Sequence, residues 1–221
     1  MAPRHFIALA GNIGTGKTTA SELIADHFDY DLFREPVVDN RFLGPYYGDM
    51  KRWSFTLQME FLFKRIDHHS EIERARTSCI QDRSLIEDPE IFAKYLHGLG
   101  HMTDDELALY YDYFQKLNAQ ARQPDKIILL HTPDVNVLLR RIAQRGREAE
   151  RSITGTFLKG LNNYYENFMD VAQQKYGLEV HMVDVTNRDI RKGRGREEFL
   201  EEIETFFKHN PRQHSELPFS S

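Results

Sequence analysis

The stretch FIALAGNIGTGKTTA (residues 6–20) decides the fold, because it joins a short apolar run to a glycine-rich turn and then to a helix-forming segment. Gly11, Gly16, Lys17 and Thr18 fit the pattern G-x-x-x-x-G-K-[ST], in which backbone N–H groups surround phosphate oxygens at a helix N-terminus. A plain strand-to-helix turn would need the glycines but not the Lys-Thr pair. The stretch (loop 11–18) therefore predicts a nucleoside triphosphate site. We expect these residues at the phosphates: Gly11, Asn12, Ile13, Gly14, Thr15, Gly16, Lys17, Thr18 and Thr19.

Short apolar runs alternate with longer amphipathic segments along the chain, a pattern typical of a parallel sheet covered by helices. We expect strands at residues 5–10, 30–35, 78–82, 126–131 and 178–184. We expect helices at residues 17–28, 51–77, 89–98, 104–122, 134–145, 153–175 and 196–208. The predicted fold is α/β: a three-layer sandwich of the P-loop NTPase type, with a five-stranded parallel sheet flanked by helices.

The composition favours one soluble domain. The chain has 221 residues, 40% of them hydrophobic, and we expect one domain over residues 1–209 and a loose tail over 210–221. No apolar stretch approaches the roughly 20 residues of a membrane span, so we expect a cytoplasmic protein without a membrane partner. A net charge of −5 argues against a general nucleic-acid binder. Cys79 is the only cysteine, which excludes an intramolecular disulfide and predicts a buried, inert thiol.

A phosphate loop does not identify the phosphate acceptor, because GTPases, ATPases and small-molecule kinases share it. A GTPase is disfavoured: the chain has no D-x-x-G sequence, and TNRD (residues 186–189) has the wrong spacing to read guanine. The remaining candidates lie at the carboxyl ends of strands, where open α/β sheets bind ligands.

Three charged residues follow predicted strands. Glu35, in REPV, is placed to accept the proton of an attacking hydroxyl, although a surface glutamate is an equally good interpretation. Asp82 is suited to hold Mg²⁺ through water, together with the hydroxyl of Thr18. Arg83 is suited to orient the acceptor oxygen and to offset charge near Glu35. A structural Asp/Arg pair is the alternative for the last two.

The long predicted helix carries a mixed face. Gln58, Phe61 and Arg65 fall at i, i+3 and i+7, which combines an amide, a ring and a guanidinium where a core stripe would be apolar. This combination favours a nucleobase pocket over plain core. Asp88, before Pro89, fits a helix N-cap, and it could instead face Arg65 across that pocket.

Four arginines surround Gly146 in LLRRIAQRGREAER. They are Arg141, Arg145, Arg147 and Arg151. Beside a phosphate loop, this spacing favours a mobile lid over about residues 141–151 that closes on the transferring phosphate. A basic, solvated helix face is the alternative.

These motifs together resemble the deoxyribonucleoside kinases, most closely the bacterial deoxyadenosine and deoxyguanosine kinases. The resemblance covers nearly the whole chain and rests on GNIGTGKTT (11–19), EPVVDN (35–40), YYGDMKRWSFTLQMEFLFKR (46–65), QDRSLIEDPEIFA (81–93), QRGREAE (144–150) and, more weakly, DVTNRDI (184–190). It implies transfer of phosphate from ATP, with Mg²⁺, to the 5′-hydroxyl of a deoxynucleoside in nucleotide salvage, by a homodimer.

The resemblance also implies residue roles. Glu35 would be the general base, with Arg83 near the 5′-oxygen and Lys17 at the phosphates. Tyr47 and Glu150 would hold the sugar 3′-hydroxyl. The base would meet Gln58, Phe61, Arg65 and Asp88, the phosphates would meet Arg141, Arg145 and Arg147, and the donor base would meet a loop at Asp189. The chain departs from the family at Asp82, where many relatives have Glu, and at Asn40, where animal relatives have Trp.

Two alternatives stay open: a thymidylate-type monophosphate kinase, and a non-catalytic nucleotide-binding subunit of the same fold. Tyr47 and Glu150 argue against the first, because sugar-hydroxyl partners suit an unphosphorylated acceptor. The presence of Lys17, Glu35 and Arg83 argues against the second. For the substrate, we expect a purine deoxynucleoside, deoxyadenosine before deoxyguanosine, with deoxycytidine left open. Feedback inhibition by dATP is a further expectation from the resemblance.

Overall fold

The computed structural model describes residues 4–35 and 40–208. The chain divides into two units, residues 1–187 and 188–221. The loose tail predicted for residues 210–221 lies outside the described residues.

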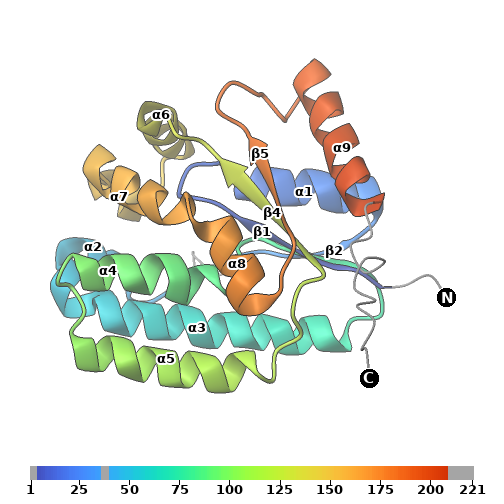
Figure 1. Ribbon diagram of the computed structural model, residues 1–221. Helices are drawn as coiled ribbons and strands as arrows, with labels where there is room; N and C mark the ends of the chain where they lie inside the picture. Colours follow the sequence, from blue (N-terminus) through green and yellow to red (C-terminus); the bar gives the residue numbers. More distant parts are fainter. Residues whose placement is uncertain (1–3, 36–39, 209–221) are drawn as a thin grey trace, which may run out of the picture. The chain divides into compact units, whose positions relative to one another are not determined.

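The first unit contains a five-stranded parallel sheet in the order β2-β3-β1-β4-β5 (Figure 1). The strands are β1 (Phe6–Ala10), β2 (Asp31–Phe33), β3 (Cys79–Gln81), β4 (Lys126–His131) and β5 (Val180–Asp184). β1 is central: Phe6 is paired with Cys79 of β3, and Ala10 is paired with Leu129 of β4. The predicted strand number and parallel direction are confirmed, and four of the five strands are shorter than expected.

Helices cover both faces of this sheet, which confirms the predicted three-layer fold. β1 is buried along its whole length, as expected for a central parallel strand with a continuous apolar sequence. Ala8 and Ala10 belong to the core beneath α3 (Met50–Arg74), α5 (Asp104–Asn118), α7 (Gly155–Tyr165) and α8 (Phe168–Tyr176). Side chains alternate along a strand, so Ile7 and Leu9 face the other layer, where α1 (Lys17–Phe28) packs on β1, β2 and β3.

Helix boundaries differ from the prediction where tertiary packing or turn chemistry decides them. The expected helix 153–175 is two helices, because the chain bends between Tyr165 and Phe168 and so buries both rings in the core. The expected helix 89–98 is a π-helical turn, Asp88–Ala93, followed by α4 (Lys94–Gly98). Two short elements were not predicted: α2 (Leu43–Gly48), whose glycines and proline indicate a turn, and a 3₁₀ turn at Glu148–Ser152.

The remaining helices are α6 (Val135–Arg145) in the first unit and α9 (Gly193–Lys208) in the second. In α9, four apolar side chains at helical spacing are buried: Phe199, Leu200, Ile203 and Phe206. Arg188 Nη1 forms an ion pair of 2.6 Å with Glu202 Oε2 of that helix.

None of the described helices is both long and apolar enough to cross a membrane. Cys79 is fully buried in β3, and burial raises the pKa of its thiol to about 11, in agreement with the predicted inert thiol.

Candidate active site

The glycine-rich loop follows β1 and packs closely against the neighbouring backbone. Gly11 has φ +144°, and a Cβ atom there would lie 2.6 Å from the carbonyl oxygen of Leu130 at the end of β4. Gly14 has φ +87°, and its Cβ would lie 2.9 Å from the carbonyl oxygen of Leu138 in α6. These two glycines are therefore required both for their backbone conformation and for the close approach.

Lys17, the first residue of α1, is buried beside this loop. Its Nζ donates hydrogen bonds to the carbonyl oxygens of Gly11 (2.7 Å) and Asn12 (3.0 Å). Burial, and then the charge of Arg83, lower the pKa of Lys17 to about 8. The ammonium is thus held against the backbone at the start of the loop.

Thr18 and Asp82 lie together at the carboxyl edge of the sheet, as the sequence predicted. Thr18 Oγ1 donates a hydrogen bond of 2.7 Å to Asp82 Oδ2. Asp82 Oδ1 is buried and has no hydrogen-bond partner in the described part of the chain. Burial, and then the nearby Glu35 charge, raise the pKa of Asp82. A hydroxyl beside a carboxylate with one unshared oxygen fits Mg²⁺, which prefers oxygen ligands and keeps several of them as water or phosphate.

No group of three or more His, Cys, Asp or Glu side chains that could hold a metal occurs within residues 4–35 and 40–208. Two oxygens from the protein are the usual number for Mg²⁺ held together with nucleotide phosphates.

Glu35 lies beyond the end of β2 and contacts two guanidinium groups. Its Oε1 accepts a hydrogen bond from Arg83 Nε and lies 3.7 Å from Arg65 Nη2. Burial acts to raise the pKa of Glu35, but the charges of Arg83, Arg65 and Lys17 outweigh it and lower that pKa to about 2. The carboxylate is therefore ionised at neutral pH and held at a fixed place by charge.

Arg65 and Asp88 form a buried, two-pronged ion pair. Arg65 Nε donates to Asp88 Oδ2 (2.7 Å), and Nη2 donates to Oδ1 (3.1 Å). The side chains are 1% and 3% exposed, so neither charge is screened by water. Arg65 Nη1 also donates to the carbonyl oxygen of Arg83 (3.3 Å). Of the two interpretations of Asp88, the helix N-cap was wrong, because Glu87 occupies the cap position, and the pairing with Arg65 is confirmed.

Glu87 is a site-proximal residue that the sequence interpretation missed, as is Tyr165, whose hydroxyl lies 2.6 Å from Glu87 Oε1. Its fully buried carboxylate forms an ion pair of 3.0 Å with Arg83 Nη1 and accepts a 2.9 Å hydrogen bond from the amide of Gly11. The only signal in the sequence was the i, i+4 spacing of Arg83 and Glu87. That spacing is common on solvated helix faces, so it did not single out this pair.

Three of the predicted base-contacting residues lie on α3: Gln58, Phe61 and Arg65. Gln58 is buried, and its Oε1 has no hydrogen-bond partner among the described residues. Phe61 is half-buried and packs against the main core. Gln58, Arg65 and Phe61 thus lie at the inner side of this helix, and the Gln58 amide is left with an unused acceptor.

Glu150, two of the lid arginines (Arg145 and Arg147) and Tyr47 form a second polar group. Glu150 Oε2 accepts from Arg145 Nη2 (2.5 Å), and Glu150 Oε1 accepts from Arg147 Nη1 (3.3 Å). Burial, and then the charge of Glu150, raise the pKa of Tyr47. Arg141 lies elsewhere, where it donates to the carbonyl oxygens of Thr15 (3.3 Å) and Val185 (2.6 Å).

Arg151, Asn40 and Asp189 also have contacts of their own. Arg151 is 76% exposed and lies 3.9 Å from Glu148, as in the alternative of a solvated face. Asn40 is buried, and its Oδ1 accepts from the amide of Phe42 (3.0 Å). Asp189, in the second unit, binds Arg191 Nε (2.8 Å), and its place at the donor base stays a prediction.

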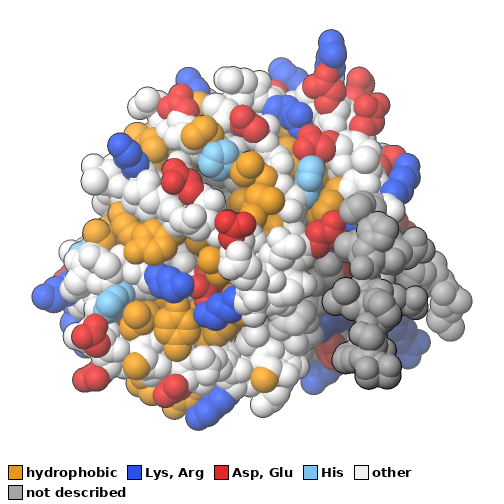
Figure 2. Space-filling view, viewed as in Figure 1, with side chains coloured by type: hydrophobic (Ala, Val, Ile, Leu, Met, Phe, Trp, Pro, Cys, Tyr) orange, Lys and Arg blue, Asp and Glu red, His pale blue; other side chains and the backbone are white. Residues whose placement is uncertain are grey.

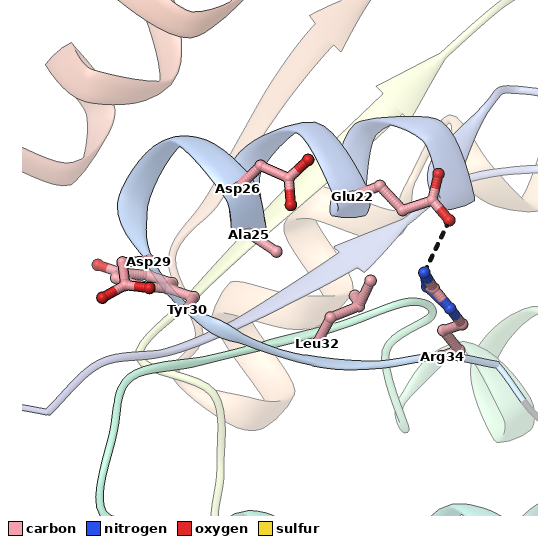
Figure 3. Close-up of a pocket in the computed structure, with 7 residues that line it drawn as sticks. All are labelled: Glu22, Ala25, Asp26, Asp29, Tyr30, Leu32 and Arg34. Carbon is pink, nitrogen blue, oxygen red and sulfur yellow. Dashed lines mark ion pairs between the residues drawn. The ribbon is translucent and has the colours of Figure 1, made fainter.

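A surface hollow of about 700 Å³ lies beside α1 and β2 (Figure 3). Side chains of α1 and β2 and of the chain beside them line it: Glu22, Ala25, Asp26, Asp29, Tyr30, Leu32 and Arg34. Arg34 Nη2 forms an ion pair of 3.0 Å with Glu22 Oε1 at its edge. No predicted site residue lines this hollow.

Residues 7–208 match the family model for deoxynucleoside kinases. The chain belongs to the deoxynucleoside kinase family. This kinase is 33% identical over 164 residues to the deoxyadenosine/deoxycytidine kinase of Bacillus subtilis (strain 168), which covers 74% of the chain and 76% of the relative. It is 30% identical over 187 residues to the deoxyguanosine kinase of the same organism (84% and 88% covered).

A solved structure agrees with this assignment. The kinase superposes on deoxyadenosine kinase from M. mycoides with bound dATP at a TM-score of 0.76, with 28% identity, over 91% of this chain and 100% of that one. The predicted family is thereby confirmed, and the enzyme is a phosphotransferase that uses ATP as the phosphoryl donor. The family match crosses the boundary between the two units at residues 187 and 188.

Proposed function

We propose that this kinase transfers the γ-phosphate of ATP to the 5′-hydroxyl of a purine deoxynucleoside in nucleotide salvage, deoxyadenosine before deoxyguanosine. The observation that carries the proposal is the buried cluster in which Glu35 contacts Arg83 and Arg65, and Arg65 binds Asp88. Beside the phosphate loop, this cluster brings together a carboxylate that can act as a general base and a charged pair that can bind a nucleobase.

Glu35 acts as the general base in this proposal. It takes the 5′-hydroxyl proton as that oxygen attacks the γ-phosphorus in line with the leaving group. A carboxylate with a pKa of about 2 is a weak base toward a free alcohol. The proton therefore moves late, once bonding to phosphorus has made the hydroxyl strongly acidic, and the charge on Glu35 chiefly orients the O–H group before that.

Lys17 and the lid arginines offset charge on the transferring group. Lys17 Nζ leaves the carbonyl oxygens of Gly11 and Asn12 for phosphate oxygens, which are stronger acceptors because they are charged. Arg145 and Arg147 start from Glu150 and reach the phosphate when the lid closes. Arg141, already bonded to the loop carbonyl of Thr15, supports the loop from its outer side.

Thr18 and Asp82 hold Mg²⁺ in this proposal, and the unshared Asp82 Oδ1 supports it. The ion would supply a Lewis acid that neutralises phosphate charge. Asp82 is one carbon shorter than the glutamate of many relatives, so contact through water suits it better than direct ligation.

The nucleoside is held at two ends. Tyr47 and Glu150 bind the sugar 3′-hydroxyl, with the Tyr47 phenol as donor because its raised pKa keeps it protonated. Gln58 pairs with the base edge through an amide that can turn to suit adenine or guanine. Asp88 accepts from an exocyclic amine and Arg65 donates to a ring acceptor. Thymine has no exocyclic amine, and this disfavours it.

The kinase is proposed to be a homodimer. α3 and α5 pack together and expose Phe63, Leu109 and Tyr113 at 43–49%. On the face drawn in Figure 2, hydrophobic side chains gather in the region of α4 and α5, with acidic and basic groups among and around them. A second copy of the chain is the proposed cover for this apolar surface, and sedimentation velocity would measure it.

The test of the function is ADP release and product mass with ATP and Mg²⁺ against deoxyadenosine, deoxyguanosine, deoxycytidine, thymidine and dTMP. We expect deoxynucleoside monophosphates from the purines first. Turnover with dTMP alone would replace the proposal by a monophosphate kinase, and silence across the panel would replace it by a binding subunit.

A further inference from the structure

Glu87 is a buried carboxylate that the proposed transfer mechanism does not use. Its Oε1 accepts from the amide of Gly11 (2.9 Å) and from Arg83 Nη1 (3.0 Å), and its Oε2 accepts from the amide of Ser84 (2.8 Å). Gly11 begins the phosphate loop, and Arg83 lies on the acceptor side beside Glu35. One side chain therefore contacts both halves of the site.

Tyr165 of α7 makes the same two-sided contact. Its hydroxyl lies 2.6 Å from Glu87 Oε1 and 2.9 Å from the carbonyl oxygen of Gly11, and it accepts from Arg83 Nη1 at 3.3 Å. Burial holds the pKa of Tyr165 well above its usual value, so the hydroxyl keeps its proton. That single proton goes to one acceptor at a time.

The carbonyl of Gly11 is the shared acceptor in this network. This oxygen accepts a hydrogen bond from Lys17 Nζ (2.7 Å) and one from the Tyr165 hydroxyl. When Lys17 turns to a phosphate oxygen, the Tyr165 hydroxyl becomes the donor that keeps this carbonyl satisfied. The first residue of the loop then stays in place while its lysine moves.

Arg83 is fixed from several sides at once. Its Nε donates to Glu35, its Nη1 pairs with Glu87, and its guanidinium carbon lies 4.6 Å from the ring centroid of Phe92. The backbone of Arg83 has φ +77°, which is unfavourable for a residue with a side chain. The bond from the Ser84 amide to Glu87 Oε2 supports that turn.

We propose that Glu87 and Tyr165 are positioning residues that hold the phosphate loop and Arg83 at a fixed distance, so that the donor phosphate and the acceptor hydroxyl meet in reactive geometry. The inference rests on the proposed function. Neither side chain has to touch either substrate in this role. Phosphoryl transfer depends on such alignment more than on covalent help from the protein, which is why loss of the link affects the rate.

Glu90, three residues after Glu87 and within the π-helical turn that Glu87 precedes, offers a matched control. Its side chain is 1% exposed, and its carboxylate binds Lys94 (2.5 Å), Lys175 (2.5 Å) and the hydroxyl of Tyr176 (2.6 Å). None of these partners belongs to the proposed site. Glu→Gln at this position therefore removes an equally buried, hydrogen-bonded charge without touching the loop or Arg83.

The experiment compares Glu87→Gln with Glu90→Gln in steady-state kinetics with ATP and the best nucleoside of the wild-type enzyme. In Glu87→Gln, only one of the two carboxylate oxygens remains as an acceptor. The NH₂ group that replaces the other oxygen faces a donor, either Arg83 Nη1 and the Gly11 amide or the Ser84 amide. We expect its kcat to fall on the order of 10²-fold, with KM for the nucleoside changed by less than about threefold. Glu90→Gln should keep kcat within about twofold of the wild type.

Tyr165→Phe is the second variant to be measured. If Glu87→Gln does not fold, Tyr165→Phe alone tests the positioning role. It keeps the ring and removes only the hydroxyl, and we expect kcat to fall about tenfold with KM for ATP raised. The inference is overturned if the folded variants at 87 and 165 both keep the kcat of Glu90→Gln. A wild-type enzyme inactive on every deoxynucleoside would instead refute the proposed function, so the two failures are distinguishable.

Discussion

The Glu35 carboxylate contacts Arg83 Nε while Arg83 Nη1 pairs with Glu87, so that one guanidinium bridges the proposed base and a fully buried second carboxylate. Burial acts to raise the pKa of Glu35, and the charge of Arg83, followed by those of Arg65 and Lys17, reverses that effect. Glu35 is thus charged at neutral pH. Its ionisation should not limit the pH profile near neutrality.

Lys17, by contrast, should cause activity to fall at alkaline pH. Its pKa of about 8 means that the free enzyme loses this charge as the pH rises through that value. Bound ATP would favour the charged form, so kcat should stay flat while kcat/KM for ATP falls above about pH 8. Initial rates against ATP from pH 6.5 to 9.5 measure both. A kcat/KM that is flat across this range would contradict the prediction.

Asp88→Asn should destabilise the fold, because it leaves the buried charge of Arg65 without its two-pronged partner. We expect the free energy of unfolding to fall by about 3 kcal/mol. Urea unfolding measures this change. Arg65→Met in the Asp88→Asn background removes the unpaired charge and should recover part of the loss. A loss in Asp88→Asn of less than about 1 kcal/mol would show that water or Glu35 replaces the partner.

His69 should make the stability depend on pH. Burial, and then the charge of Arg65, lower its folded-state pKa from 6.5 to about 4. Between these values the unfolded chain binds a proton that the folded chain does not, so the free energy of unfolding falls as the pH falls. His69 should contribute up to about 3 kcal/mol of that loss.

Urea unfolding at pH 7, 6, 5 and 4 tests the role of His69. His69→Phe should flatten the slope of stability against pH relative to the wild type. Equal slopes for His69→Phe and the wild type would show that other groups carry the pH dependence.

The sequence predicted the layers and the parallel sheet because these depend on short-range patterns. The sequence of β1 and of the glycine-rich loop after it predicts a strand, a turn and a helix in succession. The loop glycines occupy positions with positive φ angles, which residues with side chains rarely adopt. The residues at strand ends, Glu35, Asp82 and Arg83, were also predictable, since parallel strands present their carboxyl ends at one edge.

The errors concern features that depend on contacts between distant segments. The local sequence of Asp88 fits a helix cap as well as a partner of Arg65, and only packing against α3, 23 residues earlier, decides for Arg65. The bend between α7 and α8 has no proline or glycine to mark it and follows from burial of Tyr165 and Phe168. Glu87 lies 76 residues from Gly11 in sequence, so no local pattern could have joined them.

The most direct test of Glu35 as the general base is the single-turnover rate of phosphate transfer to deoxyadenosine in the wild type and in Glu35→Gln, with nucleoside binding measured by calorimetry on both. Arg83 keeps Glu87 in this variant, so the fold should persist. We predict that the transfer rate falls about 10²-fold or more while the nucleoside Kd changes by less than about threefold. A transfer rate in Glu35→Gln close to that of the wild type would contradict the role of Glu35 as the base.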